Sequence, residues 1–178
     1  MKDILKPVIV LAVICLVVTA VLASVDQITQ PVIKEAEKKA AAAARTEVLS
    51  EAKEFERIDT DIEGMPEGVE EAYRGSGNTG YVFIVETKGY GGKIKFICGI
   101  KNDGTMEAVK TLSHTETSGV GTKAVDNGSD YREGFFGKTR EDCAKVDTIT
   151  GATISSAAFK KAVDISFIAY DRVKEAER

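Results

Sequence analysis

The sequence predicts an α+β protein, with an N-terminal transmembrane helix and a helical stalk followed by an antiparallel sheet packed with helices. Three patterns favour this fold class. Pro7 to Val25 is a run of 19 residues without a charge. After residue 80, short segments rich in β-branched and aromatic residues are separated by glycine turns, which is typical of strands joined by hairpins. The C-terminal segment repeats apolar residues at intervals of three and four, as a helix does.

The apolar run near the N-terminus predicts a membrane anchor over residues 1–26. As a helix, this run would be about 28 Å long, close to the roughly 30 Å hydrocarbon thickness of a bilayer. A cleavable signal peptide remains open, because Val21-Leu22-Ala23 has small residues where a signal peptidase reads them. Both alternatives export the rest of the chain. Lys2 and Lys6 favour a cytoplasmic N-terminus, a single pass through the cell membrane and a folded domain on the extracytoplasmic side.

Residues 27–58 are predicted to form a helical stalk. From Val32 to Ile58 the chain is rich in Ala, Glu, Lys and Arg, and its apolar residues recur at helical spacing. A solvated stalk fits this charge pattern, and a partner-binding helix is the alternative. Asp59 to Gly80 is acidic and contains several glycines, which predicts a loop at the start of a folded domain over residues 59–178.

The folded domain should begin its sheet at Tyr81. Strands are predicted over Tyr81–Thr87, Lys93–Lys101 and Thr105–Leu112, and turn residues separate them, so the strands should form an antiparallel meander. Three glycines surround Tyr90 in the first turn. They fit either a tight turn or a close approach of the backbone to a planar ligand, and spacing alone does not separate the two.

The composition excludes several kinds of function. A net charge of −4 without a long basic run argues against nucleic acid as a partner. Three cysteines, none in a C-x-x-C pair, and a single histidine argue against a metal or iron–sulfur site built by this chain alone. Cys15 lies in the apolar run, so Cys98 and Cys143 are the only pair available for a disulfide within the domain. The sequence leaves open whether they pair.

The loop from Ser113 to Thr122 follows a predicted strand, where ligand-binding loops are common. Glu116 and Thr117 are its best candidates for hydrogen bonds to a polar ligand. His114 is a weaker candidate, because no nucleophile, base and orienting residue can be assigned around it, and this argues against a secreted hydrolase. Phe135 and Phe136 should supply apolar mass, either against a ring system or, as the preferred interpretation, in the core.

The segment Asp147 to Ser156 joins an acidic residue to small and hydroxyl residues just before the C-terminal helix. That helix should begin near Thr150 to Ser155. Its start would present unpaired N–H groups and the positive end of the helix dipole, which stabilise a phosphate. The alternative is that Thr150 or Thr153 is an ordinary N-cap residue.

This segment also carries a resemblance. Residues Thr150 to Ser155, T-G-A-T-I-S, resemble the S/T-G-A-T-x-S/T motif that a flavin transferase modifies, with Asp147 at the position of that motif's aspartate. The order of motifs is similar to that of the G subunit of the Rnf electron-transport complex: an N-terminal span, Gly89-Tyr90-x-Gly92, His114-x-Glu116-Thr117-x-Gly119-x-Gly121, Phe136-Gly137-Lys138, and the threonine motif. Ser118, Val120 and Thr150 replace the Pro, Leu and Ser that are usual in the family.

The resemblance implies a membrane-anchored flavoprotein with FMN bound covalently to Thr153 through a phosphoester, and no catalytic or metal site of its own. Its cofactor-binding residues would be Thr153, Thr150, Gly151, Ala152, Ser155, Asp147, Glu116, Thr117, Gly119, Gly121 and Tyr90. It would relay electrons in an Rnf-type ferredoxin:NAD ion-translocating oxidoreductase, with other membrane subunits and a flavin transferase as partners. The alternatives are the C subunit of the sodium-pumping NADH:quinone oxidoreductase, and an extracytoplasmic module that binds a phosphate ligand or a partner without redox chemistry.

Overall fold

A computed structural model describes residues 2–177 of the chain, which divides after Lys39 into two compact units. Met1 and Arg178, at the outer ends of the predicted anchor and domain, lie outside the described residues. The N-terminal unit consists of most of helix α1 (Lys2–Val48). Its large apolar side chains are exposed, from Val8 to Ile33, and it is long and apolar enough to cross a membrane. This agrees with the predicted N-terminal membrane helix.

Helix α1 ends at Val48, so the expectation of a helix as far as Ile58 is wrong in its last part. Leu49 and Ala52 follow the helix and are almost completely buried, and the chain turns there so that both side chains reach the sheet. Phe55–Ile58 instead forms strand β1. A continuous helix would carry these residues away from the apolar surface that they cover.

The loop predicted over Asp59–Gly80 is also wrong in part, because it contains strand β2 (Val69–Gly75). Strand β2 pairs with β1 on one side and with β3 (Gly80–Lys88) on the other. Its sequence, V-E-E-A-Y-R-G, is mostly charged and polar. Ala72 and Gly75 are its only buried residues, so the strand carries little of the apolar alternation by which strands are recognised.

The sheet has five antiparallel strands in the order β1-β2-β3-β4-β5, which confirms the predicted meander. Strand β4 (Lys93–Lys101) pairs with β3 and with β5 (Met106–Ser113). The tight turn between β3 and β4 is closed by a hydrogen bond from Gly89 N–H to the Gly92 carbonyl oxygen (2.7 Å). This turn projects Tyr90, whose side chain is exposed.

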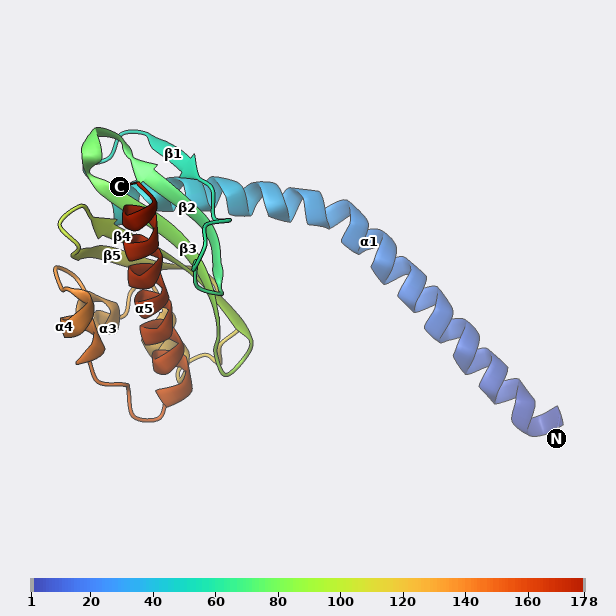
Figure 1. Ribbon diagram of the computed structural model, residues 1–178. Coiled ribbons are helices and arrows are strands. Elements are labelled where there is room, and N and C mark those ends of the chain that lie inside the picture. Colours follow the sequence, from blue (N-terminus) through green and yellow to red (C-terminus); the bar gives the residue numbers. More distant parts are fainter. Residues whose placement is uncertain (1, 178) are drawn as a thin grey trace. The chain divides into compact units, whose positions relative to one another are not determined.

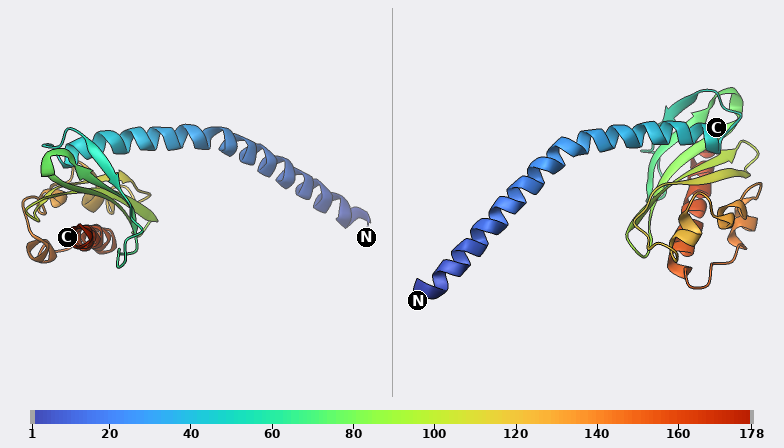
Figure 2. Two further views of the ribbon diagram at one scale, coloured as in Figure 1. Left: turned by 45° about the horizontal axis from the view of Figure 1, so that its top comes forward. Right: turned by 180° about the vertical axis from the view of Figure 1, so that it is seen from behind.

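Each face of the sheet is covered by a different helix. The long helix α5 (Thr153–Ala176) crosses one face, as the views of Figures 1 and 2 show. On that face Phe83 and Phe96 of the sheet share a core with Phe159 of α5. The opposite face, with Val82 and Ile97, packs against the last turn of α1 and the residues after it. Strands β3 and β4 are therefore buried on both sides.

Short helices connect β5 to α5. These are α2 (Thr122–Val125), α3 (Asp130–Glu133) and α4 (Arg140–Ala144), and the single turn η1 (Ser76–Asn78) joins β2 to β3. Phe135 is fully buried, as expected of a core residue, whereas Phe136 is half-buried. Cys98 and Cys143 are free thiols in this core, and burial raises their pKa values to about 12 and about 11.

Candidate functional site

The start of helix α5 is held by backbone and serine contacts, and no side chain caps it. Ala152 occupies the N-cap position, so the interpretation of Thr150 or Thr153 as an N-cap is wrong. The buried Ser156 hydroxyl accepts a hydrogen bond from Ile149 N–H (3.1 Å) and donates one to the Ala152 carbonyl oxygen (2.9 Å). Gly151 has φ +84°, a conformation that favours glycine. The loop is thereby fixed on the first helical turn.

This arrangement leaves hydrogen-bond donors free at the helix start. Within residues 2–177, the backbone N–H groups of Thr153, Ile154 and Ser155 donate to no protein acceptor. The side chain of Thr153 is exposed beside them and makes no hydrogen bond to another described residue. Three free N–H groups at the positive end of a 24-residue helix form a site that suits a phosphate.

A cleft of about 540 Å³ opens beside the helix start. Volumes of roughly 300 to 1,000 Å³ are usual for sites that bind small molecules and cofactors. Its lining residues come from three segments of the chain: Tyr90; Glu116, Thr117, Val120 and Gly121; and Gly151, Ala152, Thr153, Ile154 and Ser155. The β3–β4 turn, the loop after β5 and the start of α5 thus meet at one place.

The cleft is unusual in its exposed apolar side chains. From Ala40 to the end of the described chain, Tyr90, Val120 and Ile154 are the only large apolar residues that remain exposed, at 72%, 48% and 55%. All three line the cleft, and each comes from a different segment. Exposed apolar side chains that gather at one site mark a binding surface. A ligand with an apolar, planar part would be complementary to it.

Most of the predicted cofactor-binding residues therefore meet at this cleft: Tyr90, Glu116, Thr117, Gly121, Gly151, Ala152, Thr153 and Ser155. Asp147, Thr150 and Gly119 were predicted with them but do not line it. Val120 and Ile154 do line it, although the prediction did not include them. Both are apolar residues inside polar motifs, and that contrast is the signal that could have identified them.

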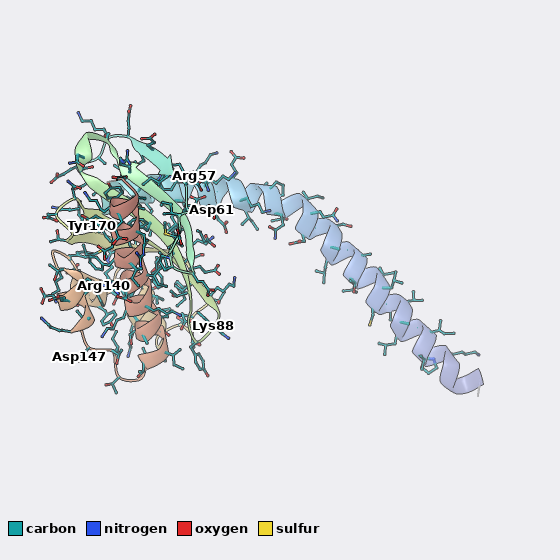
Figure 3. The ribbon with its side chains drawn as sticks, in the orientation of Figure 1. Arg57, Asp61, Lys88, Arg140, Asp147 and Tyr170 are labelled. Atoms are coloured by element: carbon teal, nitrogen blue, oxygen red, sulfur yellow. The ribbon has the colours of Figure 1, made fainter. Side chains whose placement is uncertain are left out.

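Asp147 lies on the connection between α4 and α5 and is exposed (Figure 3). Its charge acts on Tyr131 of α3: burial of the phenol is the main cause that raises the pKa of Tyr131 to about 12, and the nearby Asp147 carboxylate adds to it. The same connection is held to α5 by Lys160, whose ammonium group donates to the carbonyl oxygens of Ala144 (3.0 Å) and Val146. These contacts fix the approach of the chain to the helix start.

Glu116 is buried below the cleft, with only 8% of its surface exposed. One carboxylate oxygen, Oε1, accepts a hydrogen bond from Gly91 N–H (2.8 Å), and the other, Oε2, accepts one from the Ser155 hydroxyl. Its own N–H donates to Nδ1 of His114 (3.3 Å). Nε2 of His114 lies 3.4 Å from an oxygen of Asp126, at the end of α2, and His114 does not line the cleft.

The glycines around Tyr90 allow the β3–β4 turn to approach the loop after β5. A Cβ atom at Gly91 would lie 2.2 Å from the Thr115 carbonyl oxygen, which is too close for any side chain. The Thr115 hydroxyl in turn donates to the Gly91 carbonyl oxygen (3.1 Å). Contact with another loop therefore accounts for Gly91, so ligand contact need not be invoked to explain it.

Comparisons with known proteins find a family match that spans all three segments lining the cleft. The FMN-binding domain family matches residues 89–166, and the family described as the RnfG N-terminal region matches residues 1–48. The G subunit of the Na⁺-translocating ferredoxin:NAD⁺ oxidoreductase complex of Acetobacterium woodii is 31% identical, over 98% of this chain and 95% of that protein. The G subunit of the ion-translocating oxidoreductase complex of Shewanella piezotolerans is 27% identical over 98% of this chain and 92% of its own length. The corresponding subunit of Vibrio cholerae is 41% identical over 43% of this chain and 44% of its own length.

Proposed function

This chain belongs to the family of G subunits of Rnf-type ion-translocating oxidoreductase complexes, and on that premise we propose that it carries its FMN on Thr153 through a phosphoester bond. It is an FMN-binding subunit anchored in the membrane by α1. One observation supports Thr153 above the other hydroxyl residues. Its exposed side chain belongs to the first residue of α5, where it lines the cleft beside three free N–H groups.

The residues present fit both parts of the cofactor. The N–H groups of Thr153, Ile154 and Ser155 would hold the phosphate, and the small neighbours Gly151 and Ala152 would leave the Thr153 hydroxyl accessible to a flavin transferase. The apolar side chains of Tyr90, Val120 and Ile154 would contact the ring system. When bound, FMN supplies reversible electron transfer, while this chain binds it, orients it and sets the local charge.

The reaction that this relay serves is proposed from the relatives. The Acetobacterium woodii protein is named as a subunit of a Na⁺-translocating ferredoxin:NAD⁺ oxidoreductase. We infer that this chain passes electrons between other subunits of a complex of the same class. A covalent tether suits an electron carrier in a compartment that holds little free FMN, because it prevents loss of the cofactor by dilution.

Attachment at Thr153 is tested by co-producing the full-length chain with a flavin transferase. We expect flavin fluorescence that survives denaturing electrophoresis, and an intact mass increased by one FMN less water on the peptide containing Thr153. Thr153→Val should abolish both signals, whereas Thr153→Ser should retain them because it keeps a hydroxyl. Thr148→Val is the matched control, since Thr148 is an exposed threonine of the same connection that does not line the cleft. Flavin that resists denaturation in Thr153→Val would disprove the assignment.

We also infer that α1 is a retained anchor with its N-terminus in the cytoplasm, and that residues 40–177 lie on the extracytoplasmic side. Lys6 precedes the uncharged run and Asp26 follows it, which favours this orientation. Protease added to intact spheroplasts should release the fluorescent flavin peptide without lysis. Protection of that peptide until the membrane is broken would contradict the orientation, and a mature mass lacking the residues up to Ala23 would indicate a signal peptide.

A further inference from the structure

We propose that Glu116 is a positioning residue of the FMN cleft, whose buried carboxylate fastens the β3–β4 turn to the first turn of α5 and places a negative charge beside the cofactor. This role rests on the proposed function, in which FMN is attached at Thr153. A direct hydrogen bond from Glu116 to the ligand, as expected from the sequence, would be a different role.

The contacts of the Glu116 carboxylate support its positioning role. Glu116 belongs to the loop between β5 and α2, and both of its oxygens are engaged, one by Gly91 N–H and the other by the Ser155 hydroxyl. These partners are 25 and 39 residues away in the sequence. Charge-assisted hydrogen bonds of this kind are stronger than those between neutral groups. One side chain therefore joins all three segments that line the cleft.

The surroundings of the carboxylate have no spare room. A Cβ atom at Gly89 would lie 2.4 Å from Oε1 of Glu116, and one at Gly121 would lie 2.6 Å from Oε2. Both distances are below any real contact of a Cβ atom. The carboxylate thus fills a compartment that glycine residues leave open on two sides, as expected for a group held in one position.

Each of these two contacts lies next to a wall of the cleft. Gly91 follows Tyr90, and Ser155 follows Ile154, in the chain. Tyr90 and Ile154 are two of the three exposed apolar side chains that line the cleft. Loss of the carboxylate would leave Gly91 N–H without its acceptor and would free both walls to move. The spacing available to a planar ring would then no longer be fixed.

The negative charge of Glu116 should act on the reduction potential of the cofactor. Within residues 6–177, whose side chains the structure describes, no Lys, Arg or His forms an ion pair with this carboxylate. Its partners are an amide and a hydroxyl, supplemented by the positive end of the α5 dipole. A buried negative charge with only dipolar compensation opposes the gain of further negative charge in the cleft that it lines. It should therefore lower the reduction potential of a flavin bound there.

Three substitutions separate the positioning role of Glu116 from the effect of its charge. Glu116→Gln keeps the shape: its Oε1 can accept from Gly91 N–H and its Nε2 can donate to the Ser155 hydroxyl, but the charge is lost. Glu116→Ala removes both contacts and the charge. Ser155→Ala removes only the contact to α5. Glu141→Gln is the matched control for charge, because Glu141 is exposed on α4 and does not line the cleft.

The positioning role of Glu116 is tested by hydrogen exchange on the full-length chain in detergent, produced without a flavin transferase. Amide hydrogen exchange in the turn over residues 89–92 should be about tenfold faster in Glu116→Ala, the expected effect of losing a charge-assisted hydrogen bond. Glu116→Gln should stay within about threefold of the wild type. Ser155→Ala should accelerate exchange of the Ser156 amide, which donates to the Ala152 carbonyl oxygen, and spare the turn, which keeps the test decisive if Glu116→Ala does not fold. Wild-type exchange in the turn of Glu116→Ala, or at the helix start of Ser155→Ala, would overturn the positioning role.

The effect of the Glu116 charge on the flavin potential is tested on the chain after attachment of FMN. Glu116→Gln should shift the equilibrium between oxidised and reduced flavin about tenfold towards the reduced form, which is about 30 mV for a two-electron couple. Glu141→Gln should leave the potential at the wild-type value. An unchanged potential in Glu116→Gln would refute the effect of the charge. A wild-type chain that never acquires flavin would refute the proposed function instead, and the exchange measurements would still report on the contacts of Glu116.

Discussion

Replacement of Gly99 by alanine should destabilise the unit that begins at Ala40 by about 3 kcal/mol, towards the upper end of what overpacking usually costs. A Cβ atom at Gly99 would lie 1.9 Å from the carbonyl oxygen of Val48 and 2.6 Å from its carbonyl carbon. Both are backbone atoms at the end of α1, so no change of side-chain rotamer relieves the clash. The end of the helix would have to lift from Val82 and Ile97, which it covers.

The measurement is thermal unfolding of the full-length chain in detergent, where a loss of this size should lower Tm by roughly 6 to 12 °C. Gly128→Ala is the matched control. Gly128 is exposed, its φ is not positive, and a Cβ atom there would meet nothing within 4 Å. We expect a change of no more than about 0.5 kcal/mol in the control. Equal melting of the two variants would mean that α1 does not rest on the sheet at Gly99.

The contact at Gly99 also shows why part of the fold could not be predicted. The strands β3, β4 and β5 follow from turn residues and β-branched content, and α5 follows from its apolar spacing. The end of α1 depends on a surface formed by strands that come later in the chain. Strand β2 depends on pairing with β3, and β1 depends on pairing with β2, because charged residues interrupt the apolar pattern of both strands. Local patterns do not contain this information.

The candidate site, too, could be predicted from the sequence only in part. The hydroxyl-rich start of α5 and the loop with Glu116 could be selected from the sequence, because the chemistry of each is local. The hydrogen bonds from Gly91 and Ser155 to Glu116 join segments far apart in the chain, so their geometry required the structure. Gly119 was expected at the cleft, but its φ of +78° accounts for glycine there as a turn residue.

Replacement of Phe159 by alanine should cost about 4 kcal/mol, as truncation of a buried aromatic side chain usually does. Phe159 is 1% exposed, and its ring centroid lies 5.1 Å from those of Phe96 and Phe135 and 5.7 Å from that of Tyr131. Aromatic pairs at these distances add to the free energy gained by burial. Since α5 begins at Thr153, this cluster also anchors the helix turn that follows the proposed cofactor site.

The control for this truncation is Phe136→Ala, which removes the same atoms from a half-buried position. The Phe136 ring has the Arg132 guanidinium 5.8 Å from its centroid, an interaction of roughly 0.5 to 1 kcal/mol at an exposed site. Denaturant unfolding of the full-length chain should therefore show a loss several times larger for Phe159→Ala than for Phe136→Ala. If the two variants unfold alike, the aromatic cluster does not hold α5 on the sheet, and the support of the Thr153 site must come from the loop contacts of Glu116 and Ser156 alone.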